Sequence, residues 1–493
     1  MADKDNWKPK LKGYPHFDAP ISMQAAIDLA TNPDLVKHHK FLPFLSYRNL
    51  TKKFGSKKPK ERLIRYGARK DAYIYSYYRK LLMDLYNPLL TKLGLDECVI
   101  AYRHITYEDK GELHGKCNIN FAKEAFNEIA RRGECIAITL DISGFFESLD
   151  HKLIKKKWAR ILNAKILPED HYRVFRNITN YKIVDLDECY KRLDYMTIET
   201  MGTRKVRKYK HSRKDQPKQL CNGMQEFRDK IAGYDPLFKS IIHGNPYCDP
   251  KTDLRQWGKK NKVEYRGIPQ GSPISDVIAN MYMLDFDEKM KALADKIDGY
   301  YRRYSDDILF IIPLEISDYH ILIDSIKNAV RAEGEYLKIK DSKTLITRFF
   351  RRDCKIAYES TDARGQPKGK AFEYLGFSFD GEKILLKSQT LTRYYKKMHH
   401  GINAAVKKAM EKATIAGTID PLPFIDISAI YHSYSNPHRA WKNRDGKKAR
   451  NFISYVKRSK KLLADDAIQF QLRNHRKIIR KTLSKAITVQ SRS

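Results

Sequence analysis

The stretch YYRRYSDDILFII (300–312) decides the fold of this chain. Two apolar segments, 300–304 and 308–312, read as strands joined by a tight polar turn. The turn carries two adjacent acids, Asp306 and Asp307. An isolated SDD is more often a plain exposed turn, but the aromatic residue before it and ILFII after it place the acids at the edge of a buried sheet. Like charges held together are costly unless a cation compensates them, so this hairpin predicts a cation site.

A third carboxylate follows another apolar strand. Residues 134–142, ECIAITLDI, are short, apolar and rich in branched side chains, and Asp141 lies near their end. Phosphoryl transfer to a growing chain uses two divalent metals roughly 3.5–4 Å apart, and Mg²⁺ prefers oxygen ligands. We expect Asp141 to bridge both metals with the backbone carbonyl of Ile142, and Asp306 to be the second ligand. Asp307 is expected to support them, because adjacent strand residues point to opposite faces.

A loop rich in glycine and proline precedes a helix. The segment RGIPQGSPISDVIANMYMLDFD (266–287) opens on turn residues and then becomes apolar at helical spacing, which predicts a helix over 276–296. Ser275 or Asp276 is the expected N-cap. A glycine-bearing turn that opens a helix lets the backbone approach a base pair or a phosphate closely. Alone, such a segment is more often an ordinary joint between a loop and a helix.

The charge of the chain favours a polyanionic partner. The 493 residues contain 95 Lys and Arg against 59 Asp and Glu, a formal net charge of +36. Counterion release from phosphates makes nucleic acid the natural partner; a merely soluble basic protein and an anionic membrane surface are the lesser alternatives. The first 17 residues contain no apolar signal segment, no run is long enough to span a bilayer, and the seven cysteines form no paired cluster. We therefore expect a cytoplasmic protein without membrane contact, zinc or disulfides.

At this point the motifs resemble those of reverse transcriptases. The YSDD hairpin resembles their YxDD box, and DISGFFESLDH (141–151) is similar to their first catalytic segment. GIPQGSPISDVIANMYM looks like their next segment, with Asp276 where proline is common. The remaining matches follow in the order of the family, across roughly 61–385: RLIRYGARKDAYIYSYY (62–78), AYR (101–103), LKIKDSKT (337–344) and EYLGF (373–377).

The resemblance implies an α+β fold of the right-hand polymerase type. It predicts an N-terminal extension (1–60), a fingers and palm domain with an antiparallel sheet (61–385) interrupted by a basic insertion (185–262), and an α-helical thumb with a basic C-terminal region (386–493).

The resemblance also assigns roles to residues of this chain. Asp141, Asp306 and Asp307 are the catalytic carboxylates, and with Ile142 they hold two Mg²⁺, for which Mn²⁺ is a substitute. Phe145 takes the position of a steric gate that excludes a ribose 2′-hydroxyl and so favours dNTPs. The nucleotide pocket is expected to include Gln270 and Gly271, with Arg62, Arg69, Lys70 and Lys343 near the triphosphate. The primer end is expected against Leu375, Gly376 and Phe377.

The differences between these motifs and the usual ones narrow the choice among reverse transcriptase lineages. The fingers segment lacks the usual RPLGIP motif. Neither an HNH-type zinc endonuclease nor an RNase H carboxylate set is recognisable in the sequence. The chain looks most like bacterial reverse transcriptases of the abortive-infection and antiphage-defence ("unknown group") lineages, relatives of group II intron and retron enzymes. The resemblance implies a structured non-coding RNA as template, a DNA product, and a homo-oligomer; synthesis in such lineages is sometimes repetitive, homopolymeric or primed by a protein hydroxyl.

Three alternatives stay open at this stage. The first is a group II intron or retron-type reverse transcriptase, which a flanking intron or a short structured RNA gene would reveal. The second is a maturase-like RNA-binding protein with a vestigial polymerase site, which the retention of all three aspartates and of PQG disfavours. The third is an RNA-dependent RNA polymerase, which Phe145 disfavours.

Overall fold

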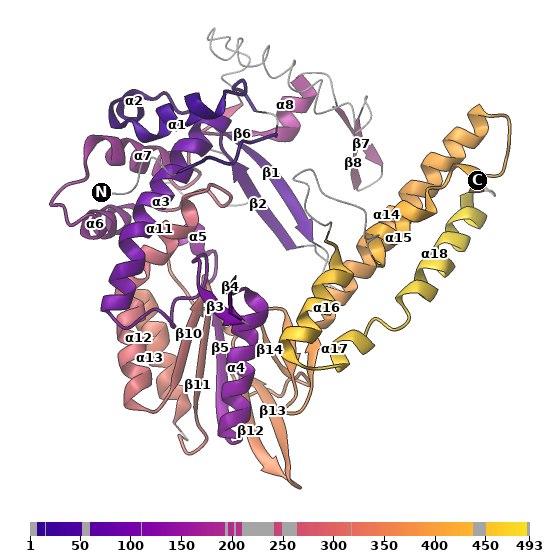
Figure 1. Cartoon of the computed structure of the whole chain (residues 1–493). Coiled ribbons are helices and arrows are strands. Elements are labelled where there is room, and N and C mark those ends of the chain that lie inside the picture. Colours follow the sequence, from indigo (N-terminus) through magenta and orange to yellow (C-terminus); the bar gives the residue numbers. More distant parts are fainter. Residues whose placement is uncertain are drawn as a thin grey trace.

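The computed structural model describes residues 7–14, 16–51, 60–109, 111–192, 196–201, 204–209, 241–248, 264–316, 318–436 and 450–490 (Figure 1). Its centre is a five-stranded antiparallel sheet in the order β10-β11-β5-β12-β13, which we call the palm sheet. Its strands are β5 (Cys135–Asp141), β10 (Tyr300–Tyr304), β11 (Asp307–Pro313), β12 (Leu345–Arg352) and β13 (Lys355–Asp362), and η2 (Asp341–Lys343) precedes β12.

The palm sheet is buried on both faces. Ile136, Ile138 and Leu140 of β5 pack in one core with α12 (Leu284–Lys296) and α13 (Tyr319–Ala332). The intervening residues Cys135 and Ala137 pack in a second core with α4 (Asn118–Arg132). Figure 1 shows these helices on opposite sides of the sheet. Burial on both faces explains why β5 and β11 read as nearly continuous apolar runs instead of alternating ones.

A second sheet belongs to the fingers and has the order β2-β1-β6-β9. Its strands are β1 (Phe44–Thr51), β2 (Lys60–Tyr66), β6 (Ile183–Asp185) and β9 (Ile242–His243). Because β1 and β2 form one antiparallel hairpin, the domain boundary expected at residue 60 falls within that hairpin. The helices around this sheet are α1 (Met23–Thr31), α2 (Pro33–His38), α3 (Arg69–Lys92), α5 (Phe145–Ser148), α6 (His151–Ile161), α7 (Glu169–Thr179), α8 (Leu186–Arg192) and α11 (Ser275–Tyr282).

The remaining strands form small sheets. They are the hairpin of β3 (Thr106–Asp109) and β4 (Glu112–Gly115), the hairpin of β7 (Met196–Met201) and β8 (Arg204–Tyr209), and the three-stranded sheet of β14 (Phe372–Tyr374), β15 (Phe377–Phe379) and β16 (Ile384–Leu386). The basic insertion expected over 185–262 lies largely outside the described residues. Its described parts are the end of β6, α8, β7, β8 and residues 241–248.

The C-terminal region is helical, as expected. It consists of α14 (Ser388–Ile415), η3 (Leu422–Phe424), α15 (Ile427–Tyr434), α16 (Phe452–Leu463), α17 (Ala467–Phe470) and α18 (His475–Gln490). We call α14–α18 the thumb. Figure 1 shows α14, α15 and α18 extending away from the palm sheet, with α16 and α17 at its base. The predicted α+β class, with an antiparallel palm sheet and a helical C-terminal region, is confirmed. Among the described helices, none is long and apolar enough to cross a bilayer.

The helix predicted over 276–296 is interrupted. It is two helices, α11 and α12, which meet at Met283. The predicted N-cap is wrong: the N-cap position belongs to Ile274, and no side chain caps the helix. Ser275 instead donates to the Pro269 carbonyl at 2.7 Å. Asp276, in the first turn, forms an ion pair with Arg79 of α3 at 2.8 Å.

Candidate active site

The strand register brings the three predicted carboxylates together. In the β5–β11 ladder, Asp141 is paired directly with Asp307. The β10–β11 hairpin turns through two residues, of which Ser305 has φ +62° and Asp306 does not have a positive φ. A positive φ at the first turn position is the mark of the tight hairpin turns that match strand twist. The Asp306 carbonyl accepts the N–H of Ile142 at 3.0 Å, so β5 and the hairpin tip are joined at the level of the acids.

A buried ion pair supports the hairpin from below. Arg303 of β10 and Asp287 of α12 are both fully buried and form two hydrogen bonds, of 2.7 and 2.6 Å. Arg303 also donates to the Ser305 carbonyl at 3.1 Å, and Tyr301 donates to Asp287 at 2.6 Å. Tyr102 donates to the Ser305 hydroxyl at 3.1 Å from the other side. These contacts fix the turn whose conformation places the aspartates.

Sequence reasoning missed Arg303 and Asp287. The only sequence signal was an arginine among apolar residues of a buried strand, which implies a partner because a buried guanidinium must be paired. The sequence does not say which acid that partner is.

Asp141, Asp306 and Asp307 repel one another, and this repulsion contributes to the raised pKa values of Asp306 and Asp307. Burial and the negative charge of Asp141 raise the pKa of Asp306. Burial first, and then the charges of Asp306 and Asp141, raise the pKa of Asp307 to about 7, against the opposing effect of Lys343. The Asp307 side chain reaches solvent, but protein atoms surround most of it, so water screens its charge only in part. A cation bound at such a cluster would offset the repulsion between the carboxylates and so stabilise their charged forms.

The oxygen atoms at the cluster fit a hard divalent cation. Asp141 and Asp306 supply carboxylates, and no hydrogen bond to the Ile142 carbonyl is found within the described part of the chain. The Lys343 ammonium forms an ion pair with Asp141 and is the cation that contacts this carboxylate in the structure. In the described segments, no group of three or more His, Cys, Asp or Glu side chains is arranged around a single point.

The PQG loop is locked against the fingers sheet. The Arg65 N–H of β2 donates to the Gln270 carbonyl at 2.9 Å. Gly271 has φ +115°, and a Cβ atom there would lie 2.6 Å from the Arg65 carbonyl oxygen. Only glycine fits both the conformation and the space. The close backbone contact seen here is with β2, and the predicted approach of this loop to a base pair or a phosphate stays a prediction.

Phe145 begins α5 immediately after Gly144, whose φ of +57° turns the chain from β5 into the helix. The Phe145 ring is 3% exposed and its centroid lies 5.7 Å from that of Phe146. Phe145 thus follows Asp141 by four residues in the chain, and its ring is packed in the hydrophobic core. Its role as a steric gate stays a prediction.

The three fingers cations predicted near the triphosphate differ in accessibility. Arg69 is buried and turned to Asp18: they form an ion pair at 3.6 Å, and the Arg69 N–H donates to the same carboxylate at 3.0 Å. The Lys70 N–H donates to Asp18 at 2.8 Å, but its side chain is only partly buried. Arg62 on β2 is exposed. Arg62 and Lys70 are therefore the ones able to reach a solvent-borne triphosphate.

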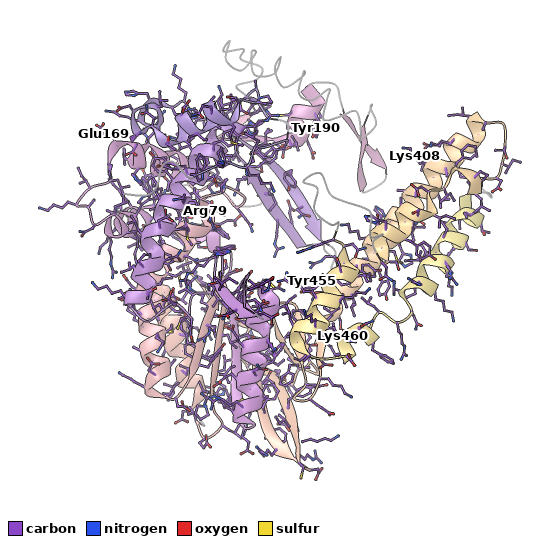
Figure 2. All side chains as sticks on the ribbon, in the orientation of Figure 1. Arg79, Glu169, Tyr190, Lys408, Tyr455 and Lys460 are labelled. Carbon is purple, nitrogen blue, oxygen red and sulfur yellow. The ribbon has the colours of Figure 1, made fainter. Side chains whose placement is uncertain are left out.

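The predicted primer-contacting segment is a turn between β14 and β15. Leu375 and Gly376 have φ of +44° and +97°, which makes a two-residue hairpin turn with both φ values positive. A non-glycine residue at positive φ is a strained conformation held by its surroundings. Here Asn118 of α4 donates to the Leu375 carbonyl at 3.0 Å and to the Tyr455 hydroxyl at 3.1 Å. Tyr455 is labelled at the base of the thumb in Figure 2. Phe377 is fully buried, so the tip of the turn is the part that can contact a ligand.

A comparison with protein families matches part of this chain. Residues 218–379 match the model of the family described as reverse transcriptase (RNA-dependent DNA polymerase). The chain carries a reverse transcriptase domain. The match covers about a third of the chain and includes Asp306 and Asp307. A domain of this family is that of an RNA-directed DNA polymerase, which is therefore the enzyme class of the domain.

Two telomerases are among the solved structures that are similar to this chain. Apo telomerase from Candida tropicalis, truncated from the C-terminal domain, is 10% identical with a TM-score of 0.36; the similarity covers 69% of this chain and 55% of that one. Telomerase from Candida albicans in complex with a TWJ fragment of telomeric RNA is 10% identical with a TM-score of 0.37, over 92% and 65%. The chain thus spans less than two thirds of either protein. No curated protein matches the sequence.

Proposed function

We propose that the protein copies an RNA template into DNA by two-metal phosphoryl transfer at Asp141, Asp306 and Asp307. The observation that carries the proposal is the register of β5 and β11, which pairs Asp141 with Asp307 beside the tip that holds Asp306. Mg²⁺, or Mn²⁺ in its place, would be held by Asp141, Asp306 and the Ile142 carbonyl. Two such ions would activate the 3′-hydroxyl and neutralise the triphosphate when bound.

The residues of the chain account for the other tasks of the reaction. Lys343, which forms an ion pair with Asp141, would supply an ammonium group to the phosphates as a contact or a proton donor. Arg62 and Lys70 bind the triphosphate. Catalysis of this kind is positioning together with charge stabilisation, so rigid supports such as the Arg303–Asp287 pair matter as much as the acids.

The test is nucleotide incorporation by the purified protein with its co-bound RNA. Wild-type protein in Mg²⁺ should incorporate labelled dNTPs, and Asp306→Ala/Asp307→Ala should lose at least about a hundredfold in rate. A matched control is Asp295→Ala/Asp324→Ala, which removes two exposed carboxylates of α12 and α13 and should incorporate as wild type does. RNA binding without incorporation by any of the proteins would refute the polymerase proposal and favour the maturase-like alternative.

The selectivity for dNTPs rests on Phe145. A smaller side chain would open the sugar pocket, so Phe145→Val should raise the ratio of NTP to dNTP incorporation. Competition between dNTPs and NTPs in the assay above measures this ratio. An unchanged ratio, or wild-type protein that prefers NTPs, would count against the steric gate.

The biological setting that we propose is antiphage defence in the bacterial cytoplasm, with a structured non-coding RNA as template. Its support is the resemblance of the fingers and of the basic helical C-terminus to the antiphage lineages. Protein-primed, repetitive or homopolymeric synthesis and assembly into a homo-oligomer belong to the same proposal. Cells that express the wild type should plate phage less efficiently than cells with Asp306→Ala/Asp307→Ala. Equal plating across a broad phage panel would contradict the defence role and leave the polymerase role standing.

A further inference from the structure

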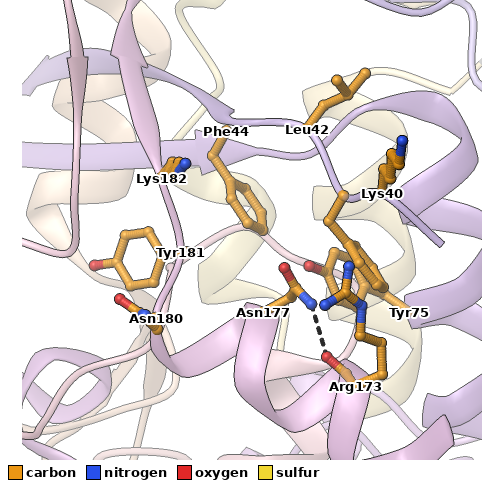
Figure 3. Close-up of a pocket in the computed structure, with 10 residues that line it drawn as sticks. Lys40, Leu42, Phe44, Tyr75, Arg173, Asn177, Asn180, Tyr181 and Lys182 are labelled. Carbon is orange, nitrogen blue, oxygen red and sulfur yellow. Dashed lines mark hydrogen bonds between the residues drawn. The ribbon is translucent and has the colours of Figure 1, made fainter. Parts of the chain in front are cut away.

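A pocket of about 240 Å³ lies on the fingers, away from the carboxylates. It is formed by the segment between α2 and β1, by α7, and by the segment between α7 and β6 (Figure 3). In Figure 1, α2 and α7 are at the far end of the fingers from the β10–β11 hairpin. The volume is below the roughly 300–1,000 Å³ of sites for drug-sized ligands, so the pocket accommodates one ring system and not a whole nucleoside triphosphate.

The rim of the pocket is cationic. Lys40, Arg173 and Lys182 lie around it, and none of its lining residues is acidic. Within the described part of the chain, no carboxylate pairs with the exposed ammonium groups of Lys40 and Lys182. Arg173 donates to the His39 carbonyl at 3.1 and 2.7 Å, which anchors its guanidinium at the rim. Three cations without an acid favour a ligand with phosphates or another concentrated negative charge.

The walls of the pocket are aromatic. The rings of Phe44 and Tyr75 are stacked with centroids 6.0 Å apart, and Phe44 meets Tyr181 edge-on at 5.9 Å. The Phe41 ring centroid lies 5.3 Å from that of Tyr75. Flat aromatic walls beside cations are how proteins hold unstacked bases of single strands, because every base has a π-face.

Polar groups in the pocket still have capacity for a ligand. The Tyr181 hydroxyl is buried, has no hydrogen-bond partner within the described segments, and points away from the other labelled lining residues in Figure 3. Burial raises the pKa of Tyr181 to about 12, so the hydroxyl keeps its proton and can donate. The Asn177 amide donates to the Arg173 carbonyl at 2.8 Å, which leaves its oxygen available, and Asn180 is exposed beside it. The amide groups of Asn177 and Asn180 suit the edge of a nucleobase.

Behind Tyr181 lies a further cation. The Arg65 guanidinium is 5.4 Å from the centre of the Tyr181 ring and fully buried, and its three nitrogen atoms have no hydrogen-bond partner within the described segments. Its positive charge adds to that of the rim. It also connects the pocket to the PQG loop, because the Arg65 backbone is hydrogen-bonded to Gln270.

We propose that this pocket binds one unstacked base of single-stranded RNA, with Lys40 and Lys182 on the phosphates that flank it. The base packs against the aromatic walls, and the amides contact its edge. Such a site would hold an unpaired part of the RNA on the fingers while the carboxylates act elsewhere. The proposal goes beyond polymerisation and does not depend on it, since binding can be measured in protein that makes no DNA.

The first test is binding of a fluorescent oligouridylate to the full-length protein. Lys40→Glu/Lys182→Glu should weaken binding at least about tenfold and lower the slope of log K against log salt by about 1.4, which is two phosphate contacts at about 0.7 each. The matched control is Lys92→Glu/Lys296→Glu, which reverses two exposed lysines of α3 and α12 and should change binding less than about twofold. Asn180→Ala, a neutral exposed change, should weaken binding without altering the slope. Equal losses in the two lysine pairs would overturn the proposal.

The second test asks whether a base enters the pocket. An abasic oligomer with the same number of phosphates should bind at least about fivefold more weakly than oligouridylate, because it cannot stack. Photocrosslinking with 4-thiouridine should label peptides that contain Phe41, Phe44 or Tyr181. Equal binding of the abasic oligomer, crosslinks confined to other peptides, or displacement of the oligomer by free AMP would each overturn it. Primer extension measured in parallel separates this inference from the proposed activity: extension without pocket binding refutes the pocket alone.

Discussion

At the scale of single residues, Asp307 combines function with a cost in stability. Its folded pKa of about 7 lies above the roughly 3.9 of an unfolded chain, so the folded protein binds the proton more tightly between these values. Stability without metal therefore falls as pH rises through this window and reaches its lower level above pH 7. We expect Asp307→Asn to remove this fall and to stabilise metal-free protein at pH 8 by on the order of 1 kcal/mol, a figure lowered because the carboxylate reaches solvent.

Thermal melting in EDTA at pH 5 and pH 8 measures the effect. The difference in melting temperature between the two pH values should be smaller in Asp307→Asn than in wild type, while Mg²⁺ should stabilise the wild type more than the variant at pH 8. Asp324→Asn, an exposed acid of α13, is the control and should keep the wild-type pH dependence. A variant that is less stable than wild type at pH 8 would show that Asp307 does not carry the repulsion.

Gly271 is a second residue whose identity is fixed, in this case by its backbone conformation and by the space around it. Alanine there would need both a rare φ of +115° and space that the Arg65 carbonyl oxygen occupies at 2.6 Å. We expect Gly271→Ala to lower the free energy of unfolding by about 1–3 kcal/mol and to reduce incorporation of dNTPs more than stability alone explains. Gly369, with no atom within 4 Å of a Cβ and no positive φ, is the matched control: Gly369→Ala should leave both quantities near wild type in denaturant titration and extension assays.

At the scale of elements, the β10–β11 hairpin depends on the buried pair of Arg303 and Asp287. Removing one partner leaves the other charged and buried, so Arg303→Met alone or Asp287→Leu alone should cost about 3–5 kcal/mol. The double variant should cost clearly less than the sum, because it leaves neither charge behind. Urea denaturation of the four proteins measures this cycle. Additive losses would mean that the pair does not act as a unit.

The strands and helices around the carboxylates show which features of the fold can be predicted from the sequence. Strands β5 and β11 are predictable because burial on both faces gives short, continuous apolar runs with an acid at one end. The break at Met283 is not, since the apolar spacing continues through it. Nor could the partners of Arg303 and Asp276 be named, because ion pairs between distant segments follow from tertiary packing and leave no mark in local periodicity.

At the scale of the whole molecule, the thumb is divided between two cores. Ile453 and Val456 of α16 pack with α4 and the palm sheet in one core. Ile479 of α18 packs with Ile402 and Val406 of α14 in another, which contains no palm residue. The base of the thumb thus shares the stability of the palm, while the outer helices depend on each other. The two cores share no fully buried residue, while the partly buried Tyr395 and Tyr434 pack against both. Cores separated in this way are the units that open separately in hydrogen exchange.

This division predicts two different responses to the same kind of cavity. Ile479→Ala should destabilise the outer core by about 2–5 kcal/mol and speed amide exchange in α14, α15 and α18 while β5 and α16 stay protected. Ile453→Ala, an equal truncation at the thumb base, should instead speed exchange in α4 and α16 and reach the palm sheet. Hydrogen exchange read by mass spectrometry distinguishes them. Uniform loss of protection in both variants would mean that palm and thumb unfold as one unit, and a thumb of that kind could not move over a bound duplex without disturbing the site that holds Asp141.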